Sequence, residues 1–324
     1  MRRLSIFGLL FGLTLLTCLL LWQGFGPIAQ LFTAAGWQIL AVPVYYGMPL
    51  TCATLSWHYL FVKGESPSWR EAFYAMWVGL GINWLLPVAQ VGGELTRARL
   101  LVERQFSLDR ALASVVSDKT LQVFTQALFT LGGLSLFVAR RSEVSLGIGA
   151  FGGVAVMGAA TFAFYRLQQA GLFGRASKLA KRFFKDNPNL DWAESAAAID
   201  AAVRATYNRR DRLVWAILWR VAFRLVLTGE SWLALWALGH PVSPIEAMIL
   251  ESLGQGARSA AFAIPGGLGA QEGGIVVVGT ALGLPPEVAL ALSLCKRFRE
   301  LAVGVPALVA WQIEEGFRLV QRQR

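Results

Sequence analysis

The stretch Ala261–Gly274, AFAIPGGLGAQEGG, interrupts the helical pattern of an apolar region of the sequence. Apolar runs of helical length precede and follow it, and its Pro-Gly-Gly core favours an irregular backbone. In the hydrocarbon of a membrane an unpaired backbone N–H or C=O costs several kcal/mol, so irregular backbone persists there only where protein buries it or where it lines a wet cavity. The stretch therefore predicts a broken membrane helix beside a cavity.

A second copy of this pattern lies 178 positions earlier, at Asn83–Arg97, NWLLPVAQVGGELTR. In one copy Pro87 and Glu94 are seven positions apart, in the other Pro265 and Glu272 are, and glycines stand between them in both. We interpret the two stretches as equivalent parts of two copies of one structural unit. The alternative is a chance match of spacing in a glycine-rich membrane chain.

Length and composition place both stretches in an integral membrane protein. Of the 324 residues, 55% are hydrophobic and 15% are charged, and the mean hydropathy is +0.51. Soluble domains carry about 25% charged residues. The longest polar segment, 166–212, leaves no room for a large soluble catalytic domain, so we expect residues 1–324 to form a single membrane domain.

The net charge and the spacing of the cysteines and histidines indicate which partners and sites are not expected. A formal net charge of +10 would suit nucleic acid, but the basic residues collect on one side of the expected spans, as the positive-inside rule describes. We therefore expect no nucleic-acid partner. The three cysteines and two histidines show no metal-ligand spacing, and nucleotide-binding and hydrolase motifs are absent from the sequence. The sequence thus predicts no metal site, no cofactor and no catalytic residues.

The apolar runs predict an all-α polytopic membrane protein with about six full spans and two re-entrant helical hairpins. The spans are expected at 4–22, 37–62, 111–138, 144–165, 213–238 and 287–311. At 1.5 Å per residue the helical pieces of the first interrupted segment would be about 24 Å and 18 Å long, short of a hydrocarbon core of about 30 Å. The hairpin breaks are expected at Pro87, Gly92, Gly93, Pro265, Gly266, Gly267 and Gly269.

The loop charges set the expected topology. With the basic loops inside, both termini are cytoplasmic, the two hairpins enter from opposite sides, and the spans around them run in opposite directions. The result is an inverted repeat, with half one at about 37–139 and half two at about 213–311. Paired segments interrupted by Gly and Pro in two inverted halves are typical of a transport site near the membrane midplane.

The segment 166–212 between the halves is expected to be a basic, amphipathic cytoplasmic loop. Within it, Arg175–Lys185 mixes apolar and basic residues in a way typical of an amphipathic helix on an anionic membrane surface. The alternative is an ordinary cytoplasmic loop that satisfies the positive-inside rule.

Two glutamates open the short helices that follow the breaks. Glu94 and Glu272 would each favour the positive end of a helix dipole, which is a purely structural role. An ionisable group at this depth of a membrane is also a candidate functional group, so the two side chains could instead face a shared cavity and bind a proton, a cation or a cationic head group.

Cations are frequent inside the expected spans. Arg220 and Arg224 are one helical turn apart, and Lys296 and Glu300 have the spacing of a helical ion pair. One interpretation is structural, with five arginines neutralised by nearby acids: Arg220, Arg224, Arg258, Arg297 and Arg299 by Asp118, Glu230, Glu251, Glu272 and Glu300. The other is a cavity for a phosphate or another anionic head group, because guanidinium groups make bidentate contacts with oxyanions.

The motifs N-x3-P-x4-GGE-x2-R in the first half and IPGGLGAQEGG, LGLPPEVALALSLCKRFRE and GVPALVAWQ in the second resemble the flippase-like family. This family includes the membrane part of lysylphosphatidylglycerol synthase, and the sequence looks most similar to the HpnL-type proteins associated with hopanoid biosynthesis. The resemblance implies a multi-pass protein of the bacterial inner membrane that moves a polar lipid between leaflets. The aminoacyl-transferase domain of the synthases has no counterpart in this sequence, so that activity is not expected.

We therefore expect a flippase or transporter for a polar lipid, either hopanoid-related or an anionic phospholipid. The expected substrate-binding residues are Asn83, Glu94, Arg97, Lys119, Arg224, Arg258, Glu272, Lys296, Arg297 and Glu300. One alternative is a non-transporting membrane partner of lipid-biosynthetic enzymes. Another is an integral-membrane transferase acting on lipid head groups with Glu272 as general base, although no nucleophile accompanies it.

Overall fold

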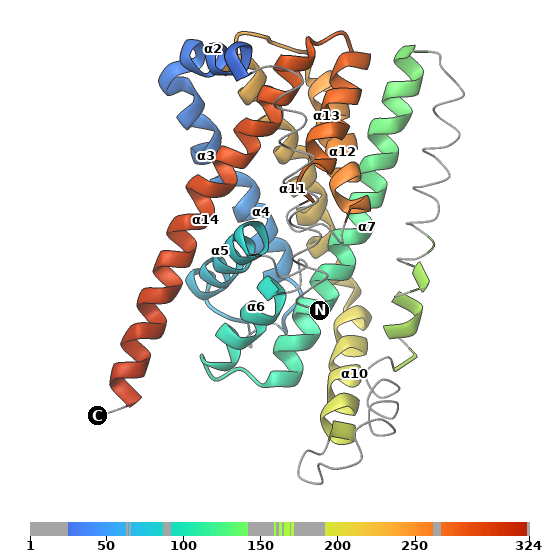
Figure 1. Cartoon of the computed structure of the whole chain (residues 1–324). Helices are drawn as coiled ribbons and strands as arrows, with labels where there is room; N and C mark the ends of the chain where they lie inside the picture. The colour runs from blue at the N-terminus through green and yellow to red at the C-terminus, as the bar shows by residue number, and fades with distance from the viewer. Residues whose placement is uncertain are drawn as a thin grey trace, which may run out of the picture.

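The computed structural model describes residues 25–62, 64, 66–86, 92–141, 159, 162–163, 165–168, 170–171, 192–261 and 267–322. Every regular element in these ranges is a helix, which confirms the all-α prediction (Figure 1). Some predicted features lie outside the described residues: the span at 4–22, most of the span at 144–165, the basic segment Arg175–Lys185, and the break residues Pro87, Pro265 and Gly266.

The helices fall into two series separated by α10 (Trp192–Asn208). The first series consists of α2 (Phe25–Ala35), η1 (Gly36–Leu40), α3 (Ala41–Tyr45), α4 (Gly47–His58), α5 (Trp69–Leu85), α6 (Gly92–Val102) and α7 (Leu108–Arg141). The second consists of α11 (Arg210–Ala237), α12 (Pro244–Ala260), α13 (Ala270–Ala281) and α14 (Pro286–Arg322). We call α4–α7 the first half and α11–α14 the second half.

Each predicted break separates two helices, although Gly92 and Gly93, which were expected in the first break, lie in the first turn of α6. Helix α5 ends at Leu85 and α6 begins at Gly92, while α12 ends at Ala260 and α13 begins at Ala270. Gly269, the residue before α13, has φ of 77°, a left-handed conformation that only glycine adopts without strain. At the second break, a conformation that favours glycine therefore coincides with the start of α13.

The first helix of each hairpin begins with the same local structure. Ser68 before α5 and Ser243 before α12 each cap the backbone N–H of a glutamate three residues later, and that glutamate accepts a hydrogen bond from the cap residue in return. This reciprocal capping box satisfies backbone donors that would otherwise remain unpaired at a helix start. The two hairpins therefore begin alike.

Each hairpin packs on the long helix of the other half. Helix α5 contacts α14, and α12 contacts α7. The contacts are close because of small residues: a Cβ on Gly81 would lie 3.1 Å from the Gly304 carbonyl oxygen, and a Cβ on Gly256 would lie 2.9 Å from the Thr130 methyl group. In Figure 1 the α5–α6 pair lies in the lower part of the bundle and the α12–α13 pair in the upper part, and α7 and α14 run in opposite directions.

The outer surface of the bundle is apolar. Two helical stretches, Ile28–His58 and Leu108–Arg140, are long and apolar enough to cross a membrane by length and composition. Helix α11 exposes Arg210 and Asp211 in its first turn but buries Arg220, Arg224 and Glu230, and its exposed hydrophobic residues are Val214, Trp215, Leu218, Val221, Leu225, Trp232 and Trp236. The outer tryptophans of this set are about 32 Å apart at 1.5 Å per residue, which matches the aromatic belts at the two edges of a bilayer.

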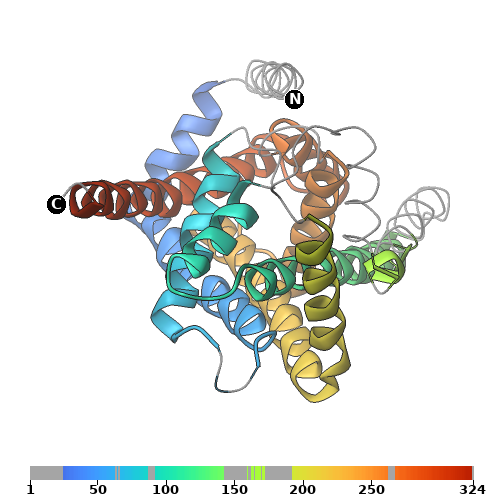
Figure 2. The same cartoon turned by 90° about the horizontal axis from the view of Figure 1, so that it is seen from below.

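Two segments differ from the sequence-based expectation. The C-terminal part of the predicted loop 166–212 forms α10, which lies against α7 and buries Ile199, Val203 and Tyr207 (Figure 2). The last span was expected to end at 311, but α14 continues to Arg322. Its extra turns carry Glu314 and Glu315, which contact arginines at the end of α6 and just beyond it.

Candidate functional site

A cavity of about 460 Å³ lies where the two halves meet. It is enclosed by side chains from both hairpins and from α4, α7, α11 and α14. Its charged lining residues are Glu94, Arg97, Asp118, Lys119, Arg220, Arg224, Arg258 and Arg299. Six of these eight are cations, so the wall is predominantly positive.

The first break contributes a pair of opposite charges to the wall. Lys119 Nζ lies 2.8 Å from Glu94 Oε1, and the Asn83 side-chain amide donates to Glu94 Oε2 at 2.9 Å. Asn83 also accepts a 2.9 Å hydrogen bond from the backbone N–H of Gly93 at the start of α6. The asparagine therefore links the end of α5 to the start of α6 and orients the glutamate.

Next to this pair, one carboxylate is shared by two arginines. Asp118 on α7 lies 2.9 Å from Arg97 Nη1 and also contacts Arg220 of α11. All three side chains are buried and line the cavity. The Arg97 guanidinium also stacks 4.1 Å from the ring centre of Trp57, a cation–π contact that fixes its position.

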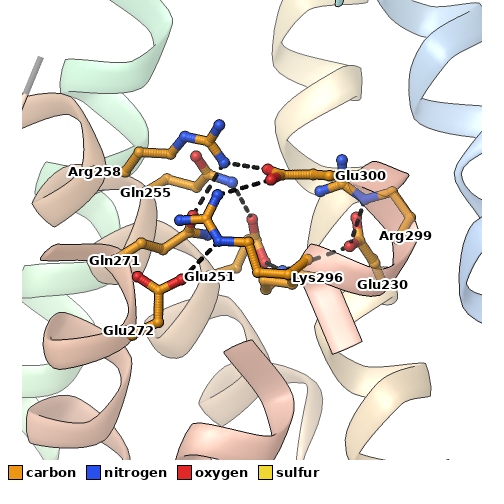
Figure 3. A network of polar contacts seen from close by, with 10 residues as sticks. Glu230, Glu251, Gln255, Arg258, Gln271, Glu272, Lys296, Arg299 and Glu300 are labelled. Carbon is orange, nitrogen blue, oxygen red and sulfur yellow. Dashed lines mark hydrogen bonds and ion pairs between the residues drawn. The ribbon is translucent and has the colours of Figure 1, made fainter. Parts of the chain in front are cut away.

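The second break has a similar cluster of opposite charges (Figure 3). Glu272 Oε1 lies 2.7 Å from Arg297 Nε, and Arg297 Nη1 lies 2.7 Å from Glu300 Oε2. The other oxygen of Glu300 contacts Arg258 Nη1, which also donates to Gln271 at 3.0 Å. Glu300 is thus a second carboxylate shared by two arginines.

A third group of charges extends from Arg299 in the cavity wall to Lys296, Glu230 and Glu251 behind it. Lys296 contacts Glu251, and its Nζ lies 3.9 Å from Glu230. Glu230 also accepts from Arg299 Nε at 3.0 Å, while the Arg299 guanidinium lies 4.1 Å from the ring centre of Tyr46. The expected helical pair between Lys296 and Glu300 is not the arrangement found, because Lys296 points towards α11 and α12.

The same ion pair occurs in both halves. Lys119 follows Glu94 by 25 positions and Arg297 follows Glu272 by 25 positions, and each cation contacts its glutamate. The two pairs differ in surroundings. Glu94 and Lys119 line the cavity, whereas neither Glu272 nor Arg297 reaches it.

The acids do not neutralise all the cations of the site. Six carboxylates, Glu94, Asp118, Glu230, Glu251, Glu272 and Glu300, face eight cations, Arg97, Lys119, Arg220, Arg224, Arg258, Lys296, Arg297 and Arg299, which leaves an excess of two positive charges. Arg224 is the cation without an acid. Among the described residues no carboxylate oxygen lies within 4.0 Å of its guanidinium, which donates to the Gln122 carbonyl at 3.0 Å.

Several buried N–H groups in this wall also have no hydrogen-bond acceptor within the described residues. They belong to four arginines: Arg97 Nε and Nη2, Arg220 Nε, Arg224 Nε and Arg299 Nη1. Buried donors are normally satisfied, by protein, water or a ligand. These nitrogens are themselves buried, so they add unsatisfied positive groups to the wall without facing the open space of the cavity.

The sequence identified most of the residues that gather here. Of the ten predicted substrate-binding residues, Asn83, Glu94, Arg97, Lys119, Arg224 and Arg258 line the cavity. The other four, Glu272, Lys296, Arg297 and Glu300, lie behind it. The prediction did not include Asp118, Arg220 or Arg299 among the site residues, although a charge within an apolar run would have marked all three.

Within the described ranges, no three His, Cys, Asp or Glu side chains are arranged to hold a metal ion.

Comparisons with known proteins place the chain in a membrane-protein family. Residues 6–307 match the family described as lysylphosphatidylglycerol synthase TM region, and the chain belongs to this family. It is also 26% identical, over 258 residues, to a UPF0104 membrane protein of Methanothermobacter thermautotrophicus, covering 74% of this chain and 75% of that relative. No solved structure matches the chain.

Proposed function

We propose that this protein transports a lipid with an anionic head group across the bacterial inner membrane, and that the head group binds in the cavity between the two halves. The observation that carries the proposal is the excess of two positive charges around the cavity, with Arg224 lacking an acid. A buried cation without a partner is costly, so such a site gains stability when an anion enters. Guanidinium groups suit a phosphate oxygen in particular.

The family supports a lipid as the cargo, because its name connects the membrane region with lysylphosphatidylglycerol synthesis. The apolar faces of α11 and α14 support it too, since the acyl chains of a lipid can remain in the bilayer while its head group enters the bundle. The cargo is either an anionic phospholipid or a hopanoid-related lipid that bears an anionic group.

We further propose that α4–α7 and α11–α14 form an inverted repeat with two re-entrant hairpins. Three features support this arrangement: the equivalent capping boxes, the equivalent ion pairs, and the packing of each hairpin against the long helix of the other half. Two inverted halves around a midplane site are the arrangement by which secondary transporters alternate their access. With the basic segment 166–212 inside, both termini are cytoplasmic.

The geometry of the cavity supports the two competing hypotheses, a transferase and a non-transporting partner, less well. A transferase with Glu272 as general base would need that carboxylate at the cavity, but Glu272 is fully buried and paired with Arg297. A non-transporting partner of lipid-biosynthetic enzymes would not need a cavity lined with cations.

The test is lipid movement in reconstituted vesicles. Purified protein would be placed in vesicles that contain a trace of fluorescent phosphatidylglycerol, and a membrane-impermeant quencher would report how much label reaches the outer leaflet. Arg224→Gln should slow this movement about tenfold, because it removes a charge-assisted contact. The same change should leave the unfolding temperature equal or higher, since it removes a buried cation without an acid.

The matched control is Arg140→Gln, which removes an exposed cation far from the cavity and should leave the rate unchanged. A rate equal to that of protein-free vesicles for the unaltered protein would reject transport of this lipid. Comparing cells with and without the gene would then separate the alternatives: a lipid with unchanged total but lost surface labelling indicates transport, and a lipid missing from the total indicates an enzyme or its partner.

A further inference from the structure

Arg258 connects the cavity with the cluster at the second break. Its side chain lines the cavity, yet its guanidinium is held by Glu300 and by the Gln271 side chain. Figure 3 shows Arg258 reaching from α12 towards Glu300 on α14. Any anion in the cavity that approaches Arg258 therefore meets a cation that already has a carboxylate.

Glu300 can leave Arg258 without becoming unpaired. Its second oxygen lies 2.7 Å from Arg297 Nη1, so this ion pair remains after the first is lost. Arg258, by contrast, would keep only the neutral Gln271 as a hydrogen-bond partner. Leaving a buried charge without a partner is strongly unfavourable, so Arg258 needs an anion at all times whereas Glu300 does not need Arg258.

The other shared carboxylate differs in this respect. Asp118 is the one acid that contacts Arg97 and Arg220 in the described part of the chain, so its departure would leave both arginines unpaired. Within the described ranges, both arginines already have buried N–H groups without an acceptor, so the loss of Asp118 would add to an existing deficit. Asp118 is therefore a fixed part of the site, and Glu300 is the exchangeable one.

We infer that Glu300 is a resident competitor of the transported anion: an oxyanion in the cavity takes its place at Arg258, and Glu300 withdraws onto Arg297. This inference rests on the proposed function and assigns the event that couples occupancy of the cavity to the second break. When Glu300 withdraws, it competes with Glu272 for the Arg297 guanidinium. The contact between Glu272 near the start of α13 and Arg297 on α14 then weakens, and α13 is held less tightly to α14.

If Glu300 competes with the anion, loss of this charged residue should strengthen binding of the anion, whereas loss of a binding residue would weaken it. The probe is dihexanoylphosphatidylglycerol, a short-chain lipid with one phosphodiester, and the zwitterionic phosphatidylcholine of the same chain length is the comparison ligand. Glu300→Gln should lower the dissociation constant for the anionic probe about tenfold, because Arg258 no longer has a carboxylate partner. Glu300→Asp, which keeps the charge but shortens its reach, should change the constant in the same direction by less.

Two control variants make the result specific to Arg258. Glu251→Gln removes a carboxylate that is equally buried and changes the net charge equally, but its cation, Lys296, does not line the cavity, so affinity should rise much less than in Glu300→Gln. In an Arg258→Gln background, Glu300→Gln should have no effect on affinity, because the two substitutions act through one contact.

Hydrogen–deuterium exchange of α13 provides a second readout. The probe should speed exchange at 270–281 in the unaltered protein but not in Glu300→Gln, because that variant has no carboxylate at position 300 to compete with Glu272 for Arg297. If Glu300→Gln leaves affinity unchanged or weakens it while the unaltered protein binds the probe, the competitor role is wrong and the anion site stands. If neither protein binds the anionic lipid better than the zwitterionic one, the inference and the proposed function both fail.

Discussion

The two breaks of this protein use the same ion pair in different surroundings. At the first break Glu94 contacts Lys119, whose side chain is 33% exposed, and both residues line the cavity. At the second break Glu272 contacts Arg297, the glutamate is fully buried, and a further carboxylate, Glu300, covers the arginine. Equivalent local sequence therefore does not produce an equivalent site, because the packing of neighbouring helices determines which ion pair lines the cavity.

In the proposed transport mechanism, the difference between the two pairs distinguishes two conformations of the molecule. If the halves are related by inversion, a second conformation exists in which the Glu272–Arg297 pair lines a cavity and the Glu94–Lys119 pair is covered. The structure then shows one end of a transport cycle. Glu300, which holds both Arg258 and Arg297, is the residue that keeps the second pair covered.

The largest expected effect is a difference in stability between variants of the two glutamates. Glu272→Gln should lower the free energy of unfolding by about 3 kcal/mol, because it breaks a buried ion pair. Glu94→Gln should cost about 1 kcal/mol or less, since the partner is partly exposed to solvent in the cavity. Thermal unfolding of both variants in the same detergent measures the difference. Equal losses of stability would mean that the two ion pairs are equally buried, which would contradict the difference between the two breaks.

The next effect concerns the packing of the first hairpin. A Cβ on Gly93 would lie 2.0 Å from the Gly79 carbonyl oxygen, so Gly93→Ala must force α5 and α6 apart. We expect a loss of about 1–3 kcal/mol, as for other overpacked sites, and release of the Asn83 contact to Glu94. Gly273→Ala in the second hairpin is the control, since its Cβ would meet nothing within 4 Å and the substitution should be neutral or mildly stabilising. The yield of folded protein and its unfolding temperature report both.

The smallest effect tests whether the two hairpins begin alike. Ser68→Ala and Ser243→Ala should each cost about 1 kcal/mol, because each removes a helix cap. Glu246, at the loop end of α12, adds a dependence on pH. The backbone N–H of Ser243 donates to its carboxylate and, with the Ser243 hydroxyl and Arg140, lowers the pKa of Glu246.

A carboxyl group whose pKa is lowered by folding contributes stability that is present above its unfolded pKa and is lost as the pH falls through the folded value. Ser243→Ala should therefore flatten the acid side of the curve of unfolding temperature against pH. An unchanged acid limb in this variant would show that the capping box of α12 does not hold the Glu246 carboxylate in solution.

The sequence alone determined the features that depend on local chemistry. Composition and apolar runs predict an all-α membrane protein, and Pro and Gly place both helix breaks, because backbone preferences act over a few residues. The spacing of 178 positions paired Glu94 with Glu272 and Lys119 with Arg297, and each glutamate does contact its cation. The contacts themselves were not predicted, because each joins two different helices whose packing the spacing does not specify.

Only the tertiary structure decided which charges share a partner. Lys296 and Glu300 have the spacing of a helical pair, yet Lys296 contacts Glu251 and Glu300 contacts Arg258, because helices from distant parts of the sequence offer better placed partners. The same packing leaves Arg224 without an acid and turns the Glu94–Lys119 pair, but not the Glu272–Arg297 pair, towards the cavity. Burial and long-range contacts set these outcomes, and neither is encoded in the spacing of residues along one helix.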